Sequence, residues 1–472
     1  MSRSLALCRA LLVLAWTLVS WLLVRRQLHA FAAFDVQWAQ DLAFFNQIFF
    51  AASEGRPWTS SLLLEPTGFF TMVHFHPIYA VILPIYLLFP EPRTLMVLNT
   101  LAVTAAAFPL AALGRRASDS AGFGLAAGLA WLSWFPMESA AGADFRAMAL
   151  WVPGIALWLF GVYARRGSAL VAGALIVAFS REESSYILSF FGVVLLVLPL
   201  GGPRRREGLV TLGLGLAWFV FLLLFKDNFF FHFDPLHPPI GEPAPPELRE
   251  ARLSWLVRAL CGGFGLAPLG PTPLALSLAP LGYLWGDAQR EWQLATGPYV
   301  HLRSGLLPLW AGAGILGAAW AARRWPRALL PLSLGLALGN LAPIWPEREQ
   351  LAELERAHRE AMAGPEVQGI RALLRRVGPE DRVATDYRLI AALSGRRVLW
   401  NVRHLYLEDG RPPHWRAQWP MTLDRVDAVV APPDDPIAAH LDEAWVREAE
   451  GGGYVLWRRV RAPEGGFPDD LP

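Results

Sequence analysis

Charged residues are scarce in this chain. Only 17% of its 472 residues are Asp, Glu, Lys or Arg, against about 25% in soluble domains. The hydrophobic share is 54%, the mean hydropathy is +0.33, and the chain has 21 Trp and 27 Phe. The net charge of +2 indicates no particular partner, and no basic block or zinc-type spacing predicts nucleic acid binding. The composition therefore predicts a membrane protein whose aromatic residues occupy interfacial belts and lipid-facing surfaces.

Cysteine is nearly absent, and this excludes two further classes of protein. The only two cysteines, Cys8 and Cys261, both lie in apolar segments, which argues against a disulfide framework and a thiolate metal site. The sequence also lacks a Gly-rich phosphate loop and a Walker or Rossmann fingerprint, so nothing in it indicates nucleotide binding.

The first apolar run covers residues 5–24. We interpret it as a retained first span rather than a signal peptide, because no small-x-small cleavage site precedes Arg25. A polar and aromatic loop is expected at 25–73, facing outward. Further apolar segments lie near residues 76–90, 94–113, 121–137, 147–163, 168–180, 185–200, 208–225, 252–267, 273–286, 304–322 and 328–345. The predicted fold class is an α-helical polytopic membrane protein, with a transmembrane domain over residues 1–345.

Arginine pairs and triplets predict the orientation of this domain. Cytoplasmic loops of inner-membrane proteins are enriched in Arg and Lys, which places the N-terminus and four clusters inside: Arg115–Arg116, Arg165–Arg166, Arg204–Arg206, and Arg323–Arg324 with Arg327. An even number of crossings must then separate the N-terminus from Arg115. Three candidate segments precede Arg115, so we expect the short, Pro-containing segment 76–90 not to cross fully; an outside N-terminus is the alternative.

The character of the sequence changes at about residue 346. Residues 347–376 read as a charged helix, and 382–385, 397–400, 427–430 and 453–457 read as short strands separated by turn or helix signals. We therefore expect residues 346–472 to form a small α/β extramembrane domain on the outward, periplasmic face.

The stretch from Asp41 to Phe50 is the strongest candidate for function. Read as a helix, it sets Asp41 and Phe45 on one face with Asn46 and Gln47 beside it, a pattern typical of a helix in the membrane interface. Asp41 then either caps the helix start or offers a carboxylate at the water edge. Asp35 lies six residues earlier.

Other polar residues gather in the segments that the arginine rule places outside. They are His74, His76, Asp144, Arg146, Arg181, Glu182, Glu183, His301 and Arg303. Charges at a membrane helix centre are unfavourable by about 2.5–3.5 kcal/mol, so those that occur tend to be functional. The alternatives are a structural interfacial His at 74 or 76, a local ion pair at Asp144 and Arg146, and a solvated loop at 181–183.

This set of side chains suits a lipid substrate with a phosphate and a polar head. Arginine binds phosphate oxygens with paired hydrogen bonds, and a carboxylate can take a proton from an attacking hydroxyl. His74 and His76 are two residues apart and so do not share a helix face, which makes a two-His metal site from one helix improbable. No cofactor is indicated; a divalent metal held by carboxylates is conceivable but unsupported by the spacing.

At these residues the chain resembles a family of bacterial membrane proteins known as domain of unknown function 2079. The family's Asp-Leu-Gly-x-Phe-Asp-Gln stretch matches Asp41 to Gln47, and a following Gly matches Gly55. Its His-Phe-Ser-Pro, Asp-Phe-His and Lys-Glu-Asp elements match residues 74–77, 144–146 and 181–183, and a late His before a Pro-containing span matches His301 to Pro308. The resemblance covers roughly residues 30–460.

The departures from the family pattern are few. Asn46 stands where the family has an acid, Arg146 stands where it has a His, and Arg181 and Glu183 are conservative changes. Arg146 therefore brings a guanidinium group to a position where the family has an imidazole.

The family in turn is similar to the GT-C class of membrane glycosyltransferases, whose usual donor is a polyprenyl-phosphate sugar. This resemblance implies that Asp41, on a juxtamembrane helix of the first outward loop, is the catalytic base. The expected partners are the lipid bilayer, a polyprenyl-phosphate sugar, and a glycan, lipid or protein acceptor, at the outer face of the bacterial inner membrane. The competing hypothesis is a transporter or a non-catalytic envelope protein, in which the charged layer lines a pathway or docks a partner.

Overall fold

A computed structural model describes the chain in two compact units that are both discontinuous in sequence. The described residues are 3–56, 58, 60–62, 75–143, 145–200, 202–229, 271–278, 305, 307–341, 347–406 and 423–460. One unit comprises Met1–Val24, His74–Tyr79 and Leu98–Arg348, and the other comprises Arg25–Val73, Ala80–Val97 and Glu349–Pro472. We call them the helical unit and the mixed unit.

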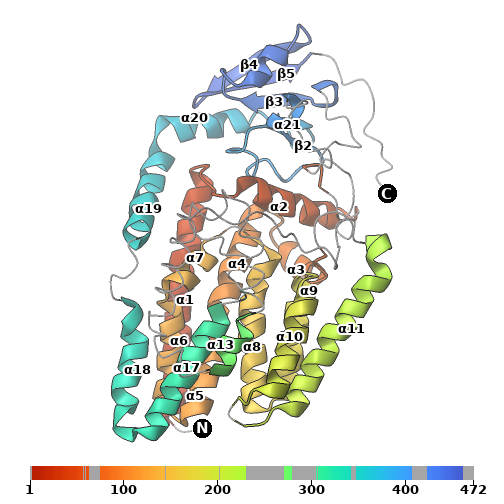
Figure 1. The fold of residues 1–472 in the computed structure, drawn as a ribbon. Helices are drawn as coiled ribbons and strands as arrows, with labels where there is room; N and C mark the ends of the chain where they lie inside the picture. Colours follow the sequence, from red (N-terminus) through yellow and green to blue (C-terminus); the bar gives the residue numbers. More distant parts are fainter. Residues whose placement is uncertain are drawn as a thin grey trace, which may run out of the picture. The chain divides into compact units, whose positions relative to one another are not determined.

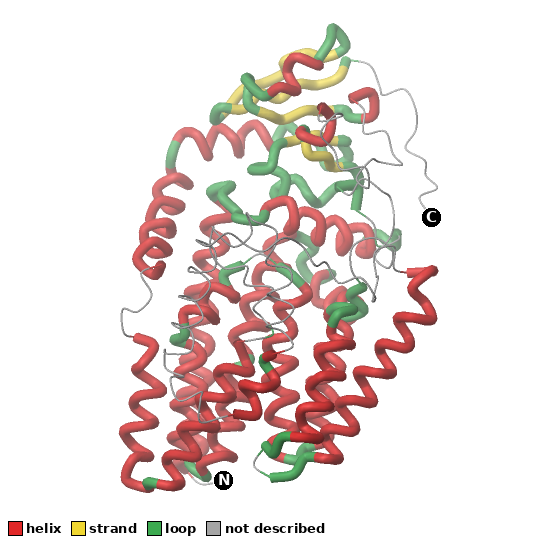
Figure 2. Tube along the Cα trace, in the orientation of Figure 1, coloured by secondary structure: helices red, strands yellow, loops and turns green. Residues whose placement is uncertain are grey.

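The helical unit is a bundle of apolar helices (Figures 1 and 2). Its elements are α1 (Arg3–Ala32), α4 (Pro92–Ala105), α5 (Ala107–Ser118), α6 (Ala121–Leu132), α7 (Phe135–Ala141), η1 (Ala147–Leu150), α8 (Trp151–Ala164), α9 (Gly167–Ser180), α10 (Ser184–Val197), α11 (Arg205–Phe229), α13 (Pro271–Leu276), α17 (Leu307–Arg324), η3 (Pro326–Ala328), α18 (Leu329–Leu338) and η4 (Gly339–Leu341). Two of them, α1 and α4, also contribute residues to the mixed unit. These helices follow most of the predicted apolar segments. The predicted segment 252–267 and most of 273–286 lie outside the described residues.

Four helical stretches in the described part are long and apolar enough to cross a membrane: Arg3–Ala32, Pro92–Ser118, Ala147–Ala164 and Arg205–Leu224. Along α1 the side chains of Leu7, Leu11, Leu14 and Leu18 are 43–65% exposed and recur every three or four residues. Such an exposed apolar stripe on one helix face suits contact with lipid tails.

Within the predicted segment 76–90, the structure has one short helix, α3 (Tyr79–Tyr86). Its eight residues, with Pro84 inside, reach about 12 Å at 1.5 Å per residue, whereas the hydrocarbon core is about 30 Å thick. α3 alone is therefore too short to span a membrane, in line with the expectation for residues 76–90.

Neighbouring helices of the bundle approach closely at glycines. A Cβ atom on Gly161 of α8 would overlap the backbone of α9 at Leu170, and one on Gly173 of α9 would overlap the backbone of α8 at Trp158. Small residues at such crossings are typical of membrane helix pairs, because van der Waals packing rather than hydrophobic burial drives their association. Buried indoles add hydrogen bonds, such as Trp151 Nε1 to the Val177 carbonyl at 3.1 Å.

The mixed unit contains the end of α1, the helix α2 (Ala39–Ser53), most of α3 and the C-terminal part of the chain. α1 continues to Ala32 rather than ending at the apolar run, so residues 25–73 are not wholly a loop. The charged segment forms two helices, α19 (Glu347–Ala363) and α20 (Pro365–Leu374). The break falls at Gly364, because proline is favoured at the first position of a helix and cannot continue the one before it.

A five-stranded sheet completes the mixed unit (Figure 2). Its strands are β1 (Val383–Thr385), β2 (Leu399–Asn401), β3 (Ala428–Ala431), β4 (Trp445–Gly451) and β5 (Tyr454–Arg459), in the order β2-β1-β3-β5-β4. The first three are parallel, and β5 pairs antiparallel with β3 and β4. The short elements α21 (Arg403–Tyr406), η6 (Leu423–Arg425) and η7 (Pro436–His440) connect the strands. The predicted strands are present, and β4 is an additional one that the sequence pattern did not reveal.

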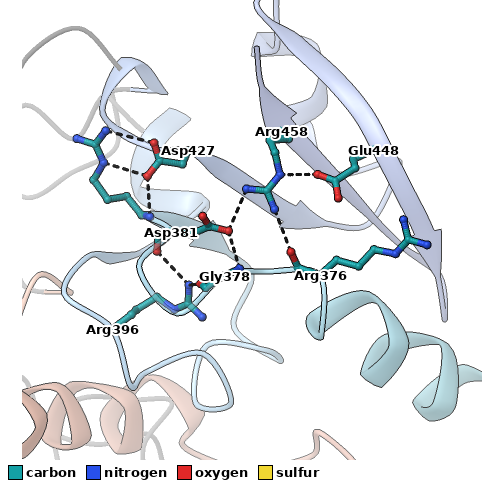
Figure 3. Close-up of polar contacts among 8 residues, drawn as sticks. Arg376, Gly378, Asp381, Arg396, Asp427, Glu448 and Arg458 are labelled. Atoms are coloured by element: carbon teal, nitrogen blue, oxygen red, sulfur yellow. Dashed lines mark hydrogen bonds and ion pairs between the residues drawn. The ribbon is translucent and has the colours of Figure 1, made fainter. Parts of the chain in front are cut away.

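Ion pairs join the sheet to the loop that precedes β1 (Figure 3). Arg458 on β5 donates to Asp381 Oδ2 at 3.0 Å and also pairs with Glu448 on β4. Arg382 makes a forked pair with Asp427 at 3.1 and 3.2 Å. The buried Arg396 donates to the backbone carbonyls of Gly378 and Asp381, and burial lowers the pKa of its guanidinium to about 10 although Asp381 opposes that shift.

Candidate functional site

Asp41 lies in the first turn of α2 in the mixed unit and is partly exposed. It is the third residue of the helix, and the N-cap residue is Trp38, whose side chain makes no cap hydrogen bond. Asp41 is therefore not the N-cap itself, although a carboxylate in the first turn is favoured by the helix dipole. The helix forms here because Ala39 to Phe50 contains no Gly or Pro, and it ends before Gly55, whose φ of 71° suits glycine.

Asn46 and Gln47 are buried side by side on α2. Asn46 Nδ2 donates to Ser394 Oγ at 3.0 Å, and Asn46 Oδ1 accepts from Tyr86 Oη at 2.8 Å. Gln47 Oε1 accepts from Ser60 Oγ at 2.7 Å and from the Ser61 backbone N–H at 3.1 Å. Both amides are thus occupied within the mixed unit, and their expected role in substrate binding stays a prediction.

Gln47 also connects α2 to the segment before β2. Its Nε2 donates to the Arg396 carbonyl at 3.2 Å, and the neighbouring Ser61 accepts the Leu399 N–H on its Oγ at 2.8 Å. No pattern in the sequence indicated this contact between residues 349 positions apart. It fixes the backbone of α2 against the C-terminal part of the same unit.

Asp35 follows the end of α1 and is exposed. Its Oδ2 lies 2.8 Å from Nε2 of His358 on α19, whose side chain is 6% exposed. A second contact between α1 and α19 joins Arg25 to Glu355 at 2.9 Å. Burial raises the pKa of the Glu355 carboxyl group, but the charges of Arg26 and Arg25 outweigh this effect and hold that pKa below its usual value. The sequence did not indicate His358 as a partner of Asp35.

A second group of predicted residues converges in the helical unit around the segment 75–79. The buried carboxylate of Glu182 accepts the Phe75 N–H on Oε2 at 2.8 Å. His76 Nδ1 lies 2.5 Å from the carbonyl oxygen of Ser180. Because a carbonyl only accepts, Nδ1 carries the proton, and neutral His76 then presents Nε2 as an acceptor.

The two arginines of this group lie near a fully buried tyrosine. Arg181 Nε is 2.7 Å from Glu183 Oε2, and both side chains are partly exposed. The charges of Arg146, Arg181 and Glu182 all act on the hydroxyl of Tyr79, whose ring lies 4.8 Å from the His76 ring. The structure thus brings together His76, Arg146, Arg181, Glu182 and Glu183, which lie in three separate parts of the sequence; we call them the Tyr79 cluster.

The Tyr79 cluster contains two guanidinium groups that can donate hydrogen bonds to an anion. It also contains the His76 imidazole, whose Nε2 is an acceptor, and two carboxylates, one of which accepts a backbone N–H. Guanidinium groups in a region of low dielectric bind phosphate oxygens well, because each offers several donors in one plane. With two arginines and two glutamates, the formal charges of the cluster cancel, and Glu183 pairs directly with Arg181.

Four predicted residues lie outside the described part of the chain: His74, Asp144, His301 and Arg303. Among the residues that the structure does describe, no group of three or more His, Cys, Asp or Glu side chains could hold a metal ion.

Residues 37–226 match the family model described as predicted membrane protein, DUF2079. The match covers 190 of the 472 residues. The match spans the α2 motif, the segment 74–77 and the motif at 181–183, and it is narrower than the range over which the motifs resemble the family. No curated protein matches the chain.

Two solved structures share the fold over nearly the whole chain. ArnT from Cupriavidus metallidurans bound to undecaprenyl phosphate is 12% identical, covers 98% of this chain and 99% of its own, and has a TM-score of 0.56. The same protein in the apo state is 13% identical with the same coverage and a TM-score of 0.54. The chain is thus a helical membrane protein with an ArnT-like fold and a small C-terminal sheet region, as the sequence predicted.

Proposed function

We propose that this chain is a GT-C-type glycosyltransferase, which transfers a sugar from a polyprenyl-phosphate donor to an acceptor hydroxyl at the outer face of the bacterial inner membrane. The observation that carries the proposal is the fold shared with ArnT, which has been crystallised with undecaprenyl phosphate. The Tyr79 cluster adds independent support, since it places two arginines in one part of a membrane bundle. The N-terminus would be cytoplasmic, and residues 346–472 would be periplasmic.

In the proposed reaction, the acceptor oxygen attacks the anomeric carbon of the donor. The bond between that carbon and the phosphate oxygen breaks, the lipid phosphate leaves, and the acceptor proton passes to a base. Asp41 is the proposed base, because it is a partly exposed carboxylate in the first turn of α2. Attack opposite the leaving group inverts the anomeric centre.

The departing phosphate carries negative charge that must be balanced. Arg146, Arg181 and His74 are the proposed stabilising groups, and preorganised cations of this kind lower the barrier because charge grows on the leaving oxygen. Glu182 holds the backbone at Phe75 and so positions the segment that carries His76. Asp144, His301 and Arg303 are proposed to bind sugar hydroxyls or phosphate.

The test is transfer and binding by purified full-length protein in nanodiscs, with a panel of polyprenyl-phosphate sugars. We expect one donor to raise the melting temperature of wild type and of Asp41→Asn alike, while Asp41→Asn loses at least about a hundredfold in transfer. Asp119→Asn is the matched control, because Asp119 is an exposed carboxylate in a turn between α5 and α6. Full transfer by a folded Asp41→Asn protein would remove Asp41 as the base, and the absence of binding by every lipid phosphate would overturn the proposed function.

A second experiment addresses the phosphate. Arg146→Ala and Arg181→Ala should each weaken donor binding about tenfold or more, since hydrogen bonds to charged groups contribute about 1.5–3 kcal/mol. Arg181→Lys should recover part of the loss, because it keeps the charge but not the planar fork. Unchanged binding in both alanine variants would exclude the Tyr79 cluster as the phosphate site.

A further inference from the structure

The mixed unit contains a pocket that the proposed transfer reaction does not use. It has a volume of about 570 Å³ and is lined by Pro365, Glu366, Arg388, Pro432, Gly452, Gly453 and Tyr454. This volume lies in the range of about 300–1,000 Å³ that is typical of small-molecule sites.

The pocket lies where the sheet topology favours a ligand. The parallel strands β1 and β3 are neighbours, and the chain leaves β1 toward β2 on one side before returning to β3 on the other. Arg388 follows the carboxyl end of β1, and Pro432 follows that of β3. Ligands of open α/β sheets bind at such switch points, because the connections leave in opposite directions and open a crevice.

The opposite wall of the pocket is held firmly by backbone contacts. The hairpin turn between β4 and β5 has Gly452 and Gly453 at φ of 61° and 78°, the conformation of a tight two-residue hairpin turn. A Cβ atom on Gly452 would overlap the Glu366 carbonyl oxygen. The turn therefore packs directly on the first turn of α20, and the pocket shape is preformed.

The polar groups of the pocket carry both signs of charge. Arg388 Nη1 pairs with Glu366 Oε1 at 2.5 Å, and the Tyr454 hydroxyl donates to Asp386 Oδ2 at 2.7 Å. Glu366 opposes an anionic ligand and Arg388 opposes a cationic one, so the lining favours a neutral ligand. The pocket thus offers a donor, Arg388, and an acceptor, Glu366, and a hydroxyl group can bond to either because it both donates and accepts.

We propose that this pocket binds a neutral sugar unit of a glycan. Glu366 accepts from one ligand hydroxyl while Arg388 donates to a neighbouring one. The site is separate from the donor chemistry and does not depend on the transfer reaction.

The test is binding of neutral oligosaccharides to the purified full chain in nanodiscs by isothermal titration calorimetry. Maltotriose, cellotriose, mannotriose and N,N′-diacetylchitobiose are the probes, with inorganic phosphate as the charged alternative. We expect at least one neutral probe to bind, and Glu366→Gln to weaken it about tenfold by removing a charged acceptor. Glu450→Gln is the matched control, because Glu366 and Glu450 are both ion-paired and their side chains are both 58% exposed; it should bind like wild type.

Three outcomes would overturn the proposal: no binding of any neutral probe, tighter binding of phosphate than of the sugars, or equal loss in Glu366→Gln and Glu450→Gln. Thermal unfolding of each variant verifies that the unit is folded. Arg388→Gln supplies a second variant from another wall of the pocket, for which we also expect about tenfold weaker sugar binding. Loss of lipid-phosphate transfer with intact sugar binding would count against the proposed function alone.

Discussion

Glu182 and Phe75 are joined by a buried hydrogen bond, from the Phe75 N–H to Glu182 Oε2 at 2.8 Å, although 107 residues separate them in sequence. The bond fixes the backbone beside His76 to the turn between α9 and α10. The carboxylate at position 182 therefore has a definite structural task within the Tyr79 cluster, whether or not it also touches a substrate.

The first prediction concerns this bond. Glu182→Ala should lower the free energy of unfolding by about 1–3 kcal/mol, because it leaves a buried N–H without an acceptor. Glu182→Gln should be less harmful, since its amide oxygen still accepts. The measurement is thermal unfolding in nanodiscs, and equal loss in the two variants would contradict the role assigned to the oxygen.

The second prediction concerns the buried amide of Gln47. Gln47→Leu should destabilise the mixed unit by about 1–3 kcal/mol, because the Ser61 N–H and the Arg396 carbonyl lose their partner. Gln37→Leu is the control, since Gln37 is exposed just before α2 and its side chain should be dispensable. Limited proteolysis followed by mass spectrometry reports the stability of α2 directly; equal cleavage rates in both variants would show that the Gln47 contacts add nothing.

The third prediction concerns pH. Burial raises the pKa of Asp386, although the Tyr454 hydroxyl and the Leu389 N–H oppose the shift. The folded state therefore binds the Asp386 proton more tightly than the unfolded state does. Between the usual pKa of an Asp carboxyl group and the raised pKa in the folded state, this group lowers the free energy of unfolding as the pH rises. We expect Asp386→Asn to flatten that part of the stability profile and to be at least as stable as wild type at pH 7.

The control for the pH prediction removes the opposing hydroxyl. Tyr454→Phe deletes the donor that favours ionised Asp386, so the pKa of Asp386 should rise further. The fall in the free energy of unfolding should then extend to higher pH. Melting temperatures from pH 4 to 8 test both variants. A profile unchanged by Asp386→Asn would mean that other groups control the stability in this range.

The fourth prediction compares two adjacent glycines. Gly452→Ala should destabilise the mixed unit by more than about 2 kcal/mol, because the left-handed backbone alone disfavours Ala by about 1–2 kcal/mol and the methyl overlaps Glu366. Gly453→Ala should show only the backbone effect, since no atom of the described residues lies within 4 Å of its added Cβ. The measurement is thermal unfolding of both variants. Similar losses of unfolding free energy in the two variants would show that the turn does not pack tightly on α20.

Local sequence patterns predicted much of the fold. The apolar segments became helices because long runs without charge favour the membrane, and β1, β2, β3 and β5 were visible as short apolar runs between turn signals. β4 was missed because it is an edge strand: Trp445–Gly451 includes Arg447, Glu448 and Glu450 and has no buried residue. Charges on edge strands prevent unwanted pairing, and they also hide the strand from a pattern based on burial.

The candidate site was predicted as a set of residues, but not as an arrangement. The sequence indicated His76, Arg146, Arg181, Glu182 and Glu183 because charges in a membrane bundle are unfavourable unless they serve a purpose. It did not indicate that Tyr79 lies among them, that His76 is protonated on Nδ1, or that Glu182 is bound to Phe75. Each of these depends on a partner in another segment.

The sequence by itself determined the class of protein, the helices, most strands and the residue types available for chemistry, because these follow from composition and local periodicity. Only the tertiary structure decided which polar groups are consumed by internal bonds. Asn46 and Gln47 were predicted as substrate ligands, and only the structure shows that their amides bond to Ser394 and to the Arg396 carbonyl within the fold. The physical reason is that a buried polar group must be paired, and the partner is chosen by contacts between residues hundreds of positions apart.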